Sequence, residues 1–525
     1  MLPDRAPENP MANAAGYITD VSYVPGFYPS MAPVLLRYVA MLNRIAPPPA
    51  KGYRYLELGC GLGRVFTTLA AADPGGEFIG VDVNPRHTSV AERDIAAGGL
   101  SNARVITADF ASMPDDVGPC SFIAIHGVYS WVAEEVREQI RTVVDKHLAP
   151  GGLLLVSYNA MPGWAHLQPI RGILRQYAAL RQGDSLQRIR DAVAYLIYIR
   201  DKQARYFIDN PRAAAYVDAL KALDVRYLAH EYLNDHWTSF YFADVAGAMR
   251  RIGLDYVGSL PIHTNFWDLC VLPEFQELFR TTSDRLVSEA HKDFCANTAF
   301  RWDVYGRRPA PLPSFGDRLA NADDLCYGLA RIDATLPHES NLGIVTSTTK
   351  GPLYDALVDL LRGGGRHLSD IVMALRPTGI ADAAIVRAVD AGVATGLLEV
   401  TMHPVPAAVP VSGDAVPRIS LPFNRALLAT DILAGRPVAL ASQVTGTGCV
   451  LGDLDAAFIH ELVGGGRNGL VERVAARMTA VGRSFERDRQ PVTDAGEHEA
   501  ILARAAAAVE GTLVPQLLRL GILEG

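Results

Sequence analysis

The chain has 525 residues, of which 49% are hydrophobic and 20% are charged, and this composition excludes a globally disordered protein. The length is enough for about three to four domains. The 49 Lys and Arg residues and the 57 Asp and Glu residues give a formal net charge of −8. Because a protein that coats nucleic acid needs a basic surface, we do not expect nucleic acid as a partner.

The six cysteines are scattered and form no Cys-x-x-Cys pair, so the sequence predicts neither a metal site nor a disulfide framework. Scattered thiols fit a cytoplasmic protein. The N-terminus has no apolar segment of signal-peptide length, and no run reaches the ~18 apolar residues that a membrane span needs. We therefore expect a cytoplasmic location and no membrane partner.

Residues 1–50 are expected to form an irregular arm and then a helix over about 30–45, which Pro47-Pro48-Pro49 ends. Tyr17, Tyr23 and Tyr28 of the arm are candidates either for closing over a ligand or for plain packing.

Strands and helices alternate from residue 53 to residue 158. The predicted strands span 53–58, 77–81, 104–107, 121–126 and 153–158. The helices between them are predicted at 65–72, 85–98 and 134–148. This alternation predicts an α/β fold with a doubly wound, mostly parallel, Rossmann-like sheet.

The alternation then stops, and residues 162–235 have a helical pattern behind a cap at Asp184-Ser185. A helix over 243–252, a strand over 254–260 and a closing strand over 268–272 are expected to complete the sheet. We therefore assign the sheet domain to 51–161 and 236–290. Residues 162–235 become a helical insertion in the position of a regulatory lid, to which we assign substrate selection.

An internal repeat marks the C-terminal part of the chain. Leu361-Arg-Gly-Gly-Gly-Arg366 recurs as Leu462-Val-Gly-Gly-Gly-Arg467, and Gly396-Leu-Leu-Glu399 recurs as Gly521-Ile-Leu-Glu524. Each copy has helices followed by a short apolar strand, which is the size and order of a winged-helix module. We expect two such α+β modules, at 351–405 and 419–525, after a linker over 291–350.

A glycine-rich loop follows the first predicted strand as Glu57-Leu-Gly59-Cys60-Gly61-Leu-Gly63. Such a loop lets a ligand approach backbone N–H groups without a clash. A dinucleotide site requires Gly-x-Gly-x-x-Gly, but the sixth position is Arg64. Gly-x-Gly-x-Gly with an acidic residue two positions before it matches fully, and it suits a cationic amino-acid ligand without phosphate.

Two carboxylates follow the next two strands. Asp82 ends the second strand, where it can accept hydrogen bonds from ribose hydroxyls, and Asp109 follows the third, where it can accept from an adenine amino group. Either residue alone is also common in turns. As an ordered set at the carboxyl ends of neighbouring strands, the two predict a ligand in the crevice there.

Together these residues resemble the class I S-adenosylmethionine-dependent methyltransferases, over about 50–160 and 240–275. The resemblance implies S-adenosylmethionine as the cofactor, with Glu57 at its amino group, Asp82 at its ribose and Asp109 at its adenine. The full set of cofactor residues that it implies is Glu57, Gly59, Cys60, Gly61, Gly63, Asp82, Val83, Asp109, Phe110 and His126.

Other segments are similar to bacterial methyltransferases with a methyltransferase regulatory domain, which include rickettsial protein lysine methyltransferases of outer-membrane proteins. They are His126-Gly-Val-Tyr-Ser-Trp131, Ser157-Tyr-Asn-Ala-Met-Pro-Gly-Trp164, His230-Glu-Tyr-Leu-Asn234 and Phe240-Tyr-Phe-Ala-Asp244. The resemblance implies methyl transfer to protein lysine side chains and a C-terminal winged-helix-like region. Ala160 departs from the Thr expected there.

The residues that face the methyl acceptor are expected after the fourth and fifth strands. His126, Tyr129, Tyr158 and Asn159 are the catalytic candidates, and their alternatives are structural roles in backbone bonding, the pocket wall and a turn. We expect Trp131 in core or lid packing. His230 and Glu231 fit a surface or interdomain salt bridge better than a catalytic pair.

Three functions stay open. The first is methyl transfer to protein lysine, the second is methyl transfer to a small metabolite, and the third is a non-catalytic, cofactor-binding regulatory protein. Methylation of nucleic acid is disfavoured because His126-Gly-Val-Tyr129 stands where the Asn/Asp-Pro-Pro-aromatic motif would be.

Overall fold

The computed structural model describes residues 13–14, 17–18, 20–21, 26–322, 324–407, 416–432, 437–487, 490–492 and 494–525. Tyr23 of the N-terminal arm lies outside the described residues, and so does the side chain of Tyr17.

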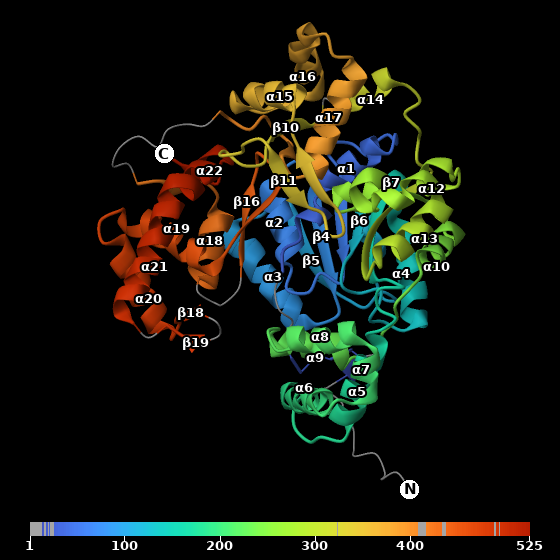
Figure 1. Cartoon of the computed structure of the whole chain (residues 1–525), viewed down its shortest axis with the longest axis vertical. Helices are drawn as coiled ribbons and strands as arrows, with labels where there is room; N and C mark the ends of the chain where they lie inside the picture. The colour runs from blue at the N-terminus through green and yellow to red at the C-terminus, as the bar shows by residue number, and fades with distance from the viewer. Residues whose placement is uncertain are drawn as a thin grey trace.

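A seven-stranded sheet with the order β5-β4-β3-β6-β7-β9-β8 forms the centre of the molecule (Figure 1). Its parallel strands are β3 (Arg54–Leu58), β4 (Glu77–Asp82), β5 (Ala103–Thr107), β6 (Cys120–Ile125) and β7 (Leu148–Asn159). β9 (Phe300–Arg307) pairs antiparallel with both β7 and β8 (Leu254–Leu260). The predicted α/β fold with a mostly parallel, doubly wound sheet is confirmed.

Helices cover both faces of this sheet, and they include α1 (Pro33–Leu42), α2 (Arg64–Ala72), α3 (Pro85–Gly98), α4 (Glu134–His147) and α10 (Phe242–Arg251). Capping residues mark both ends of α3. The Asn84 side chain accepts from the N–H of Arg86 before α3, and Pro85 takes the first helical position. Gly99 then ends α3 in the left-handed conformation.

The closing strand of the sheet differs from the prediction. Residues 268–272 were expected to form it, but they overlap α11 (Trp267–Cys270). The actual strand, β9, lies in the stretch expected to be a linker, 291–350. A strand buried on both faces normally has an apolar sequence, and β9 hides this signal because it contains Arg301 and Asp303.

These charged residues of β9 are buried in a network of ion pairs. Arg301 pairs with Asp303 at 2.9 Å, with Asp293 at 2.7 Å and with Glu289 at 2.8 Å. Burial opposes ionisation of Glu289, but Lys292 and Arg301 lower its pKa to about 2. Asp293 and Glu289 belong to α13 (Arg285–Ala296), so the network fastens this helix to the sheet.

The insertion at 162–235 is helical as predicted. It contains α5 (Gln168–Ala179), α6 (Ser185–Asp201), α7 (Arg205–Asp209), α8 (Pro211–Leu220) and α9 (Val225–Tyr232). Its helices pack around a core of their own and form a separate lobe at the bottom of Figure 1. The predicted cap is present, because the Asp184 side chain accepts from the N–H of Gln187 at 2.8 Å.

The first C-terminal module lies at the top of Figure 1. It contains α15 (Pro352–Arg362), α16 (Leu368–Leu375), α17 (Asp382–Ala394) and the short strands β13 (Arg366–His367) and β14 (Leu398–Thr401). β10 (Cys326–Leu329) is the middle strand between β13 and β14. The module therefore begins before the predicted residue 351, and this is a second reason why 291–350 is not a linker.

The second module lies at the left of Figure 1. Its helices are α18 (Pro422–Asp431), α19 (Asp453–Gly465), α20 (Leu470–Ala480), α21 (Ala495–Ala508) and α22 (Val514–Arg519). Its strand pairs are β16 (Val438–Ser442) with β17 (Thr447–Leu451), and β15 (Arg418–Ile419) with β20 (Leu523–Glu524). Gly396 and Gly521 hold the same place in the repeat, with φ of 74° and 64° before β14 and β20. The winged-helix character of both modules stays a prediction.

The continuous helical segment at 496–519 has the length and apolar composition of a membrane-crossing helix. Its buried residues include Leu502, Ala506, Val509 and Leu517, which pack into the core of the second module. The expected lack of a membrane partner stays a prediction.

We predict that Arg301→Ala lowers the free energy of opening β9 by about 3–5 kcal/mol, because the buried carboxylates of Asp293 and Asp303 lose their ion pair and Glu289 keeps only Lys292. Hydrogen exchange of the β9 amides measures this opening locally in a chain of several domains. Arg280→Ala is the control, since Arg280 forms an exposed pair with Glu277, and this change should stay within about 1 kcal/mol. Equal effects of the two substitutions would show that the network does not hold β9.

Candidate functional site

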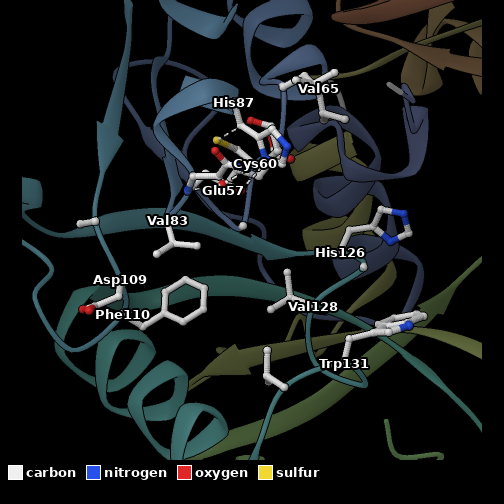
Figure 2. A pocket seen from close by; sticks show the side chains of 18 of the residues that line it. Glu57, Cys60, Val65, Val83, His87, Asp109, Phe110, His126, Val128 and Trp131 are labelled. Carbon is white, nitrogen blue, oxygen red and sulfur yellow. Dashed lines mark hydrogen bonds and ion pairs between the residues drawn. The ribbon is translucent and has the colours of Figure 1, made fainter. Parts of the chain in front are cut away.

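A cavity of about 490 Å³ lies at the carboxyl ends of the parallel strands β3, β4 and β6. Its wall includes most of the predicted cofactor residues, which are Glu57, Gly59, Cys60, Gly61, Asp82, Val83, Asp109, Phe110 and His126. In Figure 2, Glu57, Cys60 and His87 gather at one end of the pocket, whereas His126 and Trp131 stand at another. The crevice predicted from strand ends is therefore present as a formed cavity.

The three glycines of the loop serve different purposes. All have positive φ, of 75° at Gly59, 54° at Gly61 and 78° at Gly63, which disfavours any side chain. A Cβ on Gly59 would lie 2.3 Å from Val128 Cγ2, and one on Gly63 would lie 2.5 Å from Ala91 Cβ. Gly61 has no such neighbour and faces the cavity. Gly63, predicted as a cofactor residue, does not line the cavity; it allows α2 to pack closely on α3.

Glu57 places a buried carboxylate in the cavity wall. The side chain is only 5% exposed, and its Oε2 has no hydrogen-bond partner among the described residues. Burial raises the pKa of Glu57 to about 8. A buried acceptor without a partner is costly, and an ammonium group from a ligand would offset that cost. The geometry therefore fits the amino group of an amino-acid ligand such as the methionyl part of S-adenosylmethionine.

Asp82 ties the loop to the end of β4. Its carboxylate accepts from the N–H groups of Gly61 and Asn84, both at 2.9 Å, and its Oδ1 lies 3.2 Å from His87 Nδ1. A carboxylate has about four acceptor positions, so it can still accept from ribose hydroxyls. His87 was not predicted; its Nε2 is buried without a partner in the described part of the chain.

The predicted adenine side of the cavity contains Asp109 and Phe110. The Asp109 carboxylate accepts from the N–H and the hydroxyl of Ser112, both at 2.7 Å, and these bonds lower its pKa. Figure 2 shows this carboxylate turned outward and the Phe110 ring turned toward the pocket. Phe110 thus offers an apolar surface to a flat ring, while the bond from Asp109 to adenine stays a prediction.

His126 stands among aromatic side chains at the end of β6. Its ring is stacked on Trp302 with centroids 4.1 Å apart, and it meets Tyr28 edge-on at 4.0 Å and Phe300 at 6.2 Å. Its Nδ1 lies 2.8 Å from the Ser157 hydroxyl. Burial lowers the pKa of His126 to about 3, so the imidazole is neutral at physiological pH. This end of the cavity is aromatic and uncharged.

Tyr129 and Tyr158 do not line this cavity, contrary to the prediction that they face the acceptor. The Tyr129 hydroxyl accepts from Arg141 at 2.9 Å, and the Tyr158 hydroxyl donates to the buried Asp303. Successive side chains of a strand point to opposite faces. Since Ser157 of β7 reaches His126, Tyr158 points to the opposite face of the sheet, whereas the Tyr129 hydroxyl is turned to Arg141 of α4.

Asn159 ends β7 beside a buried acid of the insertion. Its backbone N–H donates to the Ser130 hydroxyl at 2.8 Å, and its side chain neighbours Glu231 of α9. Glu231 is 7% exposed, and burial raises its pKa to about 7 although Trp237, Asn159 and Arg171 favour the ionised form. Glu231 is therefore a buried carboxyl near the acceptor side of the site and not part of an exposed salt bridge.

His230, the expected partner of Glu231, has a separate role. Its Nε2 lies 3.0 Å from the backbone oxygen of Val21, which belongs to the N-terminal arm. Burial lowers its pKa to about 4. His230 therefore connects the insertion to the arm as a neutral side chain.

Four more aromatic residues line the cavity or contact His126. Tyr28 lines the cavity, as one of its two predicted alternatives stated, and so does Trp131, which was expected in packing. Trp302 and Phe300 were missed because they lie in the supposed linker. The alternation Phe300-Arg-Trp302-Asp-Val304 is a strand pattern that could have identified them. Within the described residues, no group of three or more His, Cys, Asp or Glu side chains could hold a metal ion.

Two family descriptions match parts of the chain. Residues 56–152 match "Methyltransferase domain", and residues 224–307 match "Predicted methyltransferase regulatory domain". The second match was expected in the insertion at 162–235. It includes only α9 of that insertion and continues through α10 and β8 to the end of β9.

Relatives and solved structures resemble nearly the whole chain. An uncharacterized protein of Synechocystis sp. is 25% identical over 510 residues, which are 97% of this chain and 99% of that protein. An uncharacterized protein of Rickettsia prowazekii is 28% identical over 302 residues, 55% of this chain and 54% of that protein. PKMT2 from Rickettsia typhi, in complex with AdoHcy, has the same fold with a TM-score of 0.71 and 18% identity, covering 96% of this chain and 100% of that chain. The cofactor predicted from the glycine loop, S-adenosylmethionine, is thereby confirmed.

We predict that S-adenosylmethionine binding at about pH 7 releases a proton from Glu57. With a pKa of about 8 the free carboxyl is mostly protonated there, whereas the ammonium of the ligand favours the carboxylate. Calorimetry in buffers of different ionisation enthalpy should give a release approaching one proton per site. Glu57→Gln should abolish the release and weaken binding, and the exposed control Glu274→Gln should change neither. An unaltered release in Glu57→Gln would contradict the assignment.

Proposed function

We propose that this S-adenosylmethionine-dependent methyltransferase transfers methyl groups to lysine side chains of proteins. The observation that carries the proposal is the acceptor side of the site, where the aromatic side chains around His126 are linked through Tyr28 and Tyr227 to the buried carboxyl of Glu231. Aromatic faces attract an ammonium group, and a carboxylate supplies its counter-charge. The fold that the chain shares with PKMT2 from Rickettsia typhi also supports the proposal.

Several contacts connect Glu231 with the cavity. Tyr227 is an electrostatic neighbour of both Glu231 and Tyr28, and Tyr28 lines the cavity beside His126. On the other side, Asn159 neighbours Glu231 and pairs across the sheet with Phe300 of β9. Residues of the arm, the insertion and β9 are thus connected on the side of the cavity where we expect the methyl group of the cofactor.

The chemistry asks for a neutral amine in a dry pocket. The cofactor supplies a methyl group on a sulfonium, so the amine lone pair forms the new N–C bond while the C–S electron pair returns to sulfur. The rings of Tyr28, His126 and Trp302 exclude water, which lowers the pKa of an entering lysine. The proton that the ammonium gives up can pass to Glu231. Neutral His126 adds no positive charge that would repel the substrate.

We predict that Glu231→Gln lowers the methylation rate by about 100-fold, a typical contribution of one proton-accepting side chain. Because the ionised carboxylate accepts the proton, the rate of the unaltered enzyme should rise with pH through about 7, which is the pKa of Glu231. The variant should lose this limb and keep only the rise that follows the amine itself. S-adenosylmethionine affinity should not change, and Glu274→Gln should retain the full profile. A Glu231→Gln enzyme with the same pH profile would rule out this role.

A second prediction concerns the acceptor class. When the chain is incubated with bacterial lysate and S-adenosylmethionine labelled in the methyl group, label should enter protein bands, and acid hydrolysis should yield methylated lysine. Asp82→Ala, which removes the ribose contact, serves as the inactive control. Label confined to small molecules would favour the metabolite alternative, and label in RNA would favour a nucleic-acid acceptor. No transfer to any fraction would favour the non-catalytic alternative, and each of these three results contradicts the proposal.

A further inference from the structure

A second cavity, of about 440 Å³, lies between the two C-terminal modules and shares no lining residue with the cofactor cavity. One wall comes from the first module, through Glu399 of β14 and the segment that follows β10. The opposite wall comes from β17, the first turn of α19 and the helical segment that ends the second module. Both modules are therefore needed to form the cavity.

Glu399 is the most unusual group in this cavity. Its Oε1 is buried and has no hydrogen-bond partner in the described part of the chain. Burial raises the pKa of Glu399 to about 7, and the opposing influence of Arg519 does not compensate. The Arg519 guanidinium is committed to backbone oxygens, donating to Leu329 at 2.9 Å and to Pro406 at 3.3 Å. An acceptor atom that is buried without a partner is costly, so the Oε1 of Glu399 fits a donor from outside the chain.

The internal repeat provides a comparison for Glu399. Glu524 occupies the same place in Gly521-Ile-Leu-Glu524 as Glu399 does in Gly396-Leu-Leu-Glu399. Glu524 is exposed at the end of β20, whereas Glu399 lines the cavity. The half-buried position of Glu399 in the cavity wall therefore comes from its place between the modules and is not a requirement of the repeated fold.

Other acceptors surround the same space. The Thr447 hydroxyl oxygen is buried without a partner, and Asp455 also lines the cavity, where burial and then Asp453 raise its pKa. The one cation in the lining, Arg331, forms an exposed ion pair with Asp333 at 2.9 Å. Among the described lining residues, the carboxyls of Glu399 and Asp455 thus have no ion pair, and the Thr447 hydroxyl has no hydrogen-bond partner.

The backbone of the last helical segment is irregular where it meets the cavity. Between α21 and α22 the chain forms a π-helical turn, Val509–Leu513, and Val509, Thr512 and Leu513 line the cavity. Such turns are rare and occur frequently at functional sites, because they widen the helix and redirect its side chains. This feature is independent of the charges and points to the same place.

We propose that this cavity binds a ligand with a primary ammonium group, either a free alkylamine or the lysine side chain of a bound peptide. Glu399 is its counter-ion, and Thr447 and Asp455 accept its remaining N–H groups. An ammonium offers three donors, which matches these three acceptors. The site is separate from the methyl-transfer site, so the two can be tested independently.

Calorimetry with n-butylammonium chloride tests the site, with n-butanol as the neutral ligand of equal shape. The unaltered chain and Glu524→Gln should bind the ammonium and not the alcohol, and Glu399→Gln should bind at least about 10-fold more weakly. Thr447→Val, which keeps the shape and removes the hydroxyl, should weaken binding several-fold. Thermal unfolding confirms that each variant is folded.

A capped Ala-Lys-Ala peptide distinguishes the two sources of the ammonium group. Binding of the peptide that depends on Glu399 assigns the cavity to a lysine side chain, and binding of n-butylammonium alone assigns it to a free amine. The proposal is overturned if n-butylammonium gives no binding heat, if n-butanol binds equally well, or if Glu399→Gln binds as the unaltered chain does. None of these readouts uses methyl transfer. Because the proposed acceptor site also attracts an ammonium group, the titrations are repeated in the Glu231→Gln background, where the binding that depends on Glu399 should persist.

Discussion

The buried ion pairs of Arg301 determine the shape of the acceptor side of the molecule. They allow β9 to lie inside the sheet between β7 and β8 although the strand contains the buried charges of Arg301 and Asp303. Phe300 and Trp302 stand on either side of Arg301 and therefore point to the opposite face, where Trp302 stacks on His126. One strand thus presents charges to α13 and aromatic rings to His126, which lines the cavity. The match to the regulatory domain ends with this strand. The matched segment therefore supplies Trp302 beside His126, in addition to α9 of the insertion.

Sequence patterns predicted the parts of the site that rest on local rules. The glycine loop, Asp82 and the alternation of strands depend on backbone conformation and on apolar periodicity, which a sequence displays directly. The strand β9 was not predicted, because its Arg301 is paired with Glu289 and Asp293 of α13, and the sequence alone does not display these contacts. Tyr158 was misplaced for a related reason: a strand end indicates where a residue lies, whereas the pleat decides which face its side chain takes. Glu399 could be recognised as part of a repeat. Nothing in its local sequence shows that its Oε1 is buried, whereas Glu524 of the second copy is exposed.

Three buried carboxyls with raised pKa values follow one physical principle in different places. Glu57 lines the cofactor cavity, Glu231 lies beside the end of β7, and Glu399 lies between the C-terminal modules. Burial disfavours the charged form in each case, and no ion pair among the described residues compensates. The carboxyl of Glu289 shows the contrast, because Lys292 and Arg301 lower its pKa to about 2. The chain thus stabilises one buried carboxylate with its own cations, whereas the assignments above give each of the other three a cationic ligand.

The C-terminal modules are also joined to the cofactor domain by close packing. Gly448 of β17 lines the second cavity, and a Cβ at this position would lie 2.8 Å from the Phe27 ring and 3.0 Å from Thr68 of α2. Phe27 directly precedes Tyr28, which borders the cofactor cavity, and α2 directly follows the glycine loop. Packed interiors have little free volume, so β17 cannot move without displacing Phe27 or α2. The wall of the second cavity is therefore continuous with the residues that enclose the cofactor.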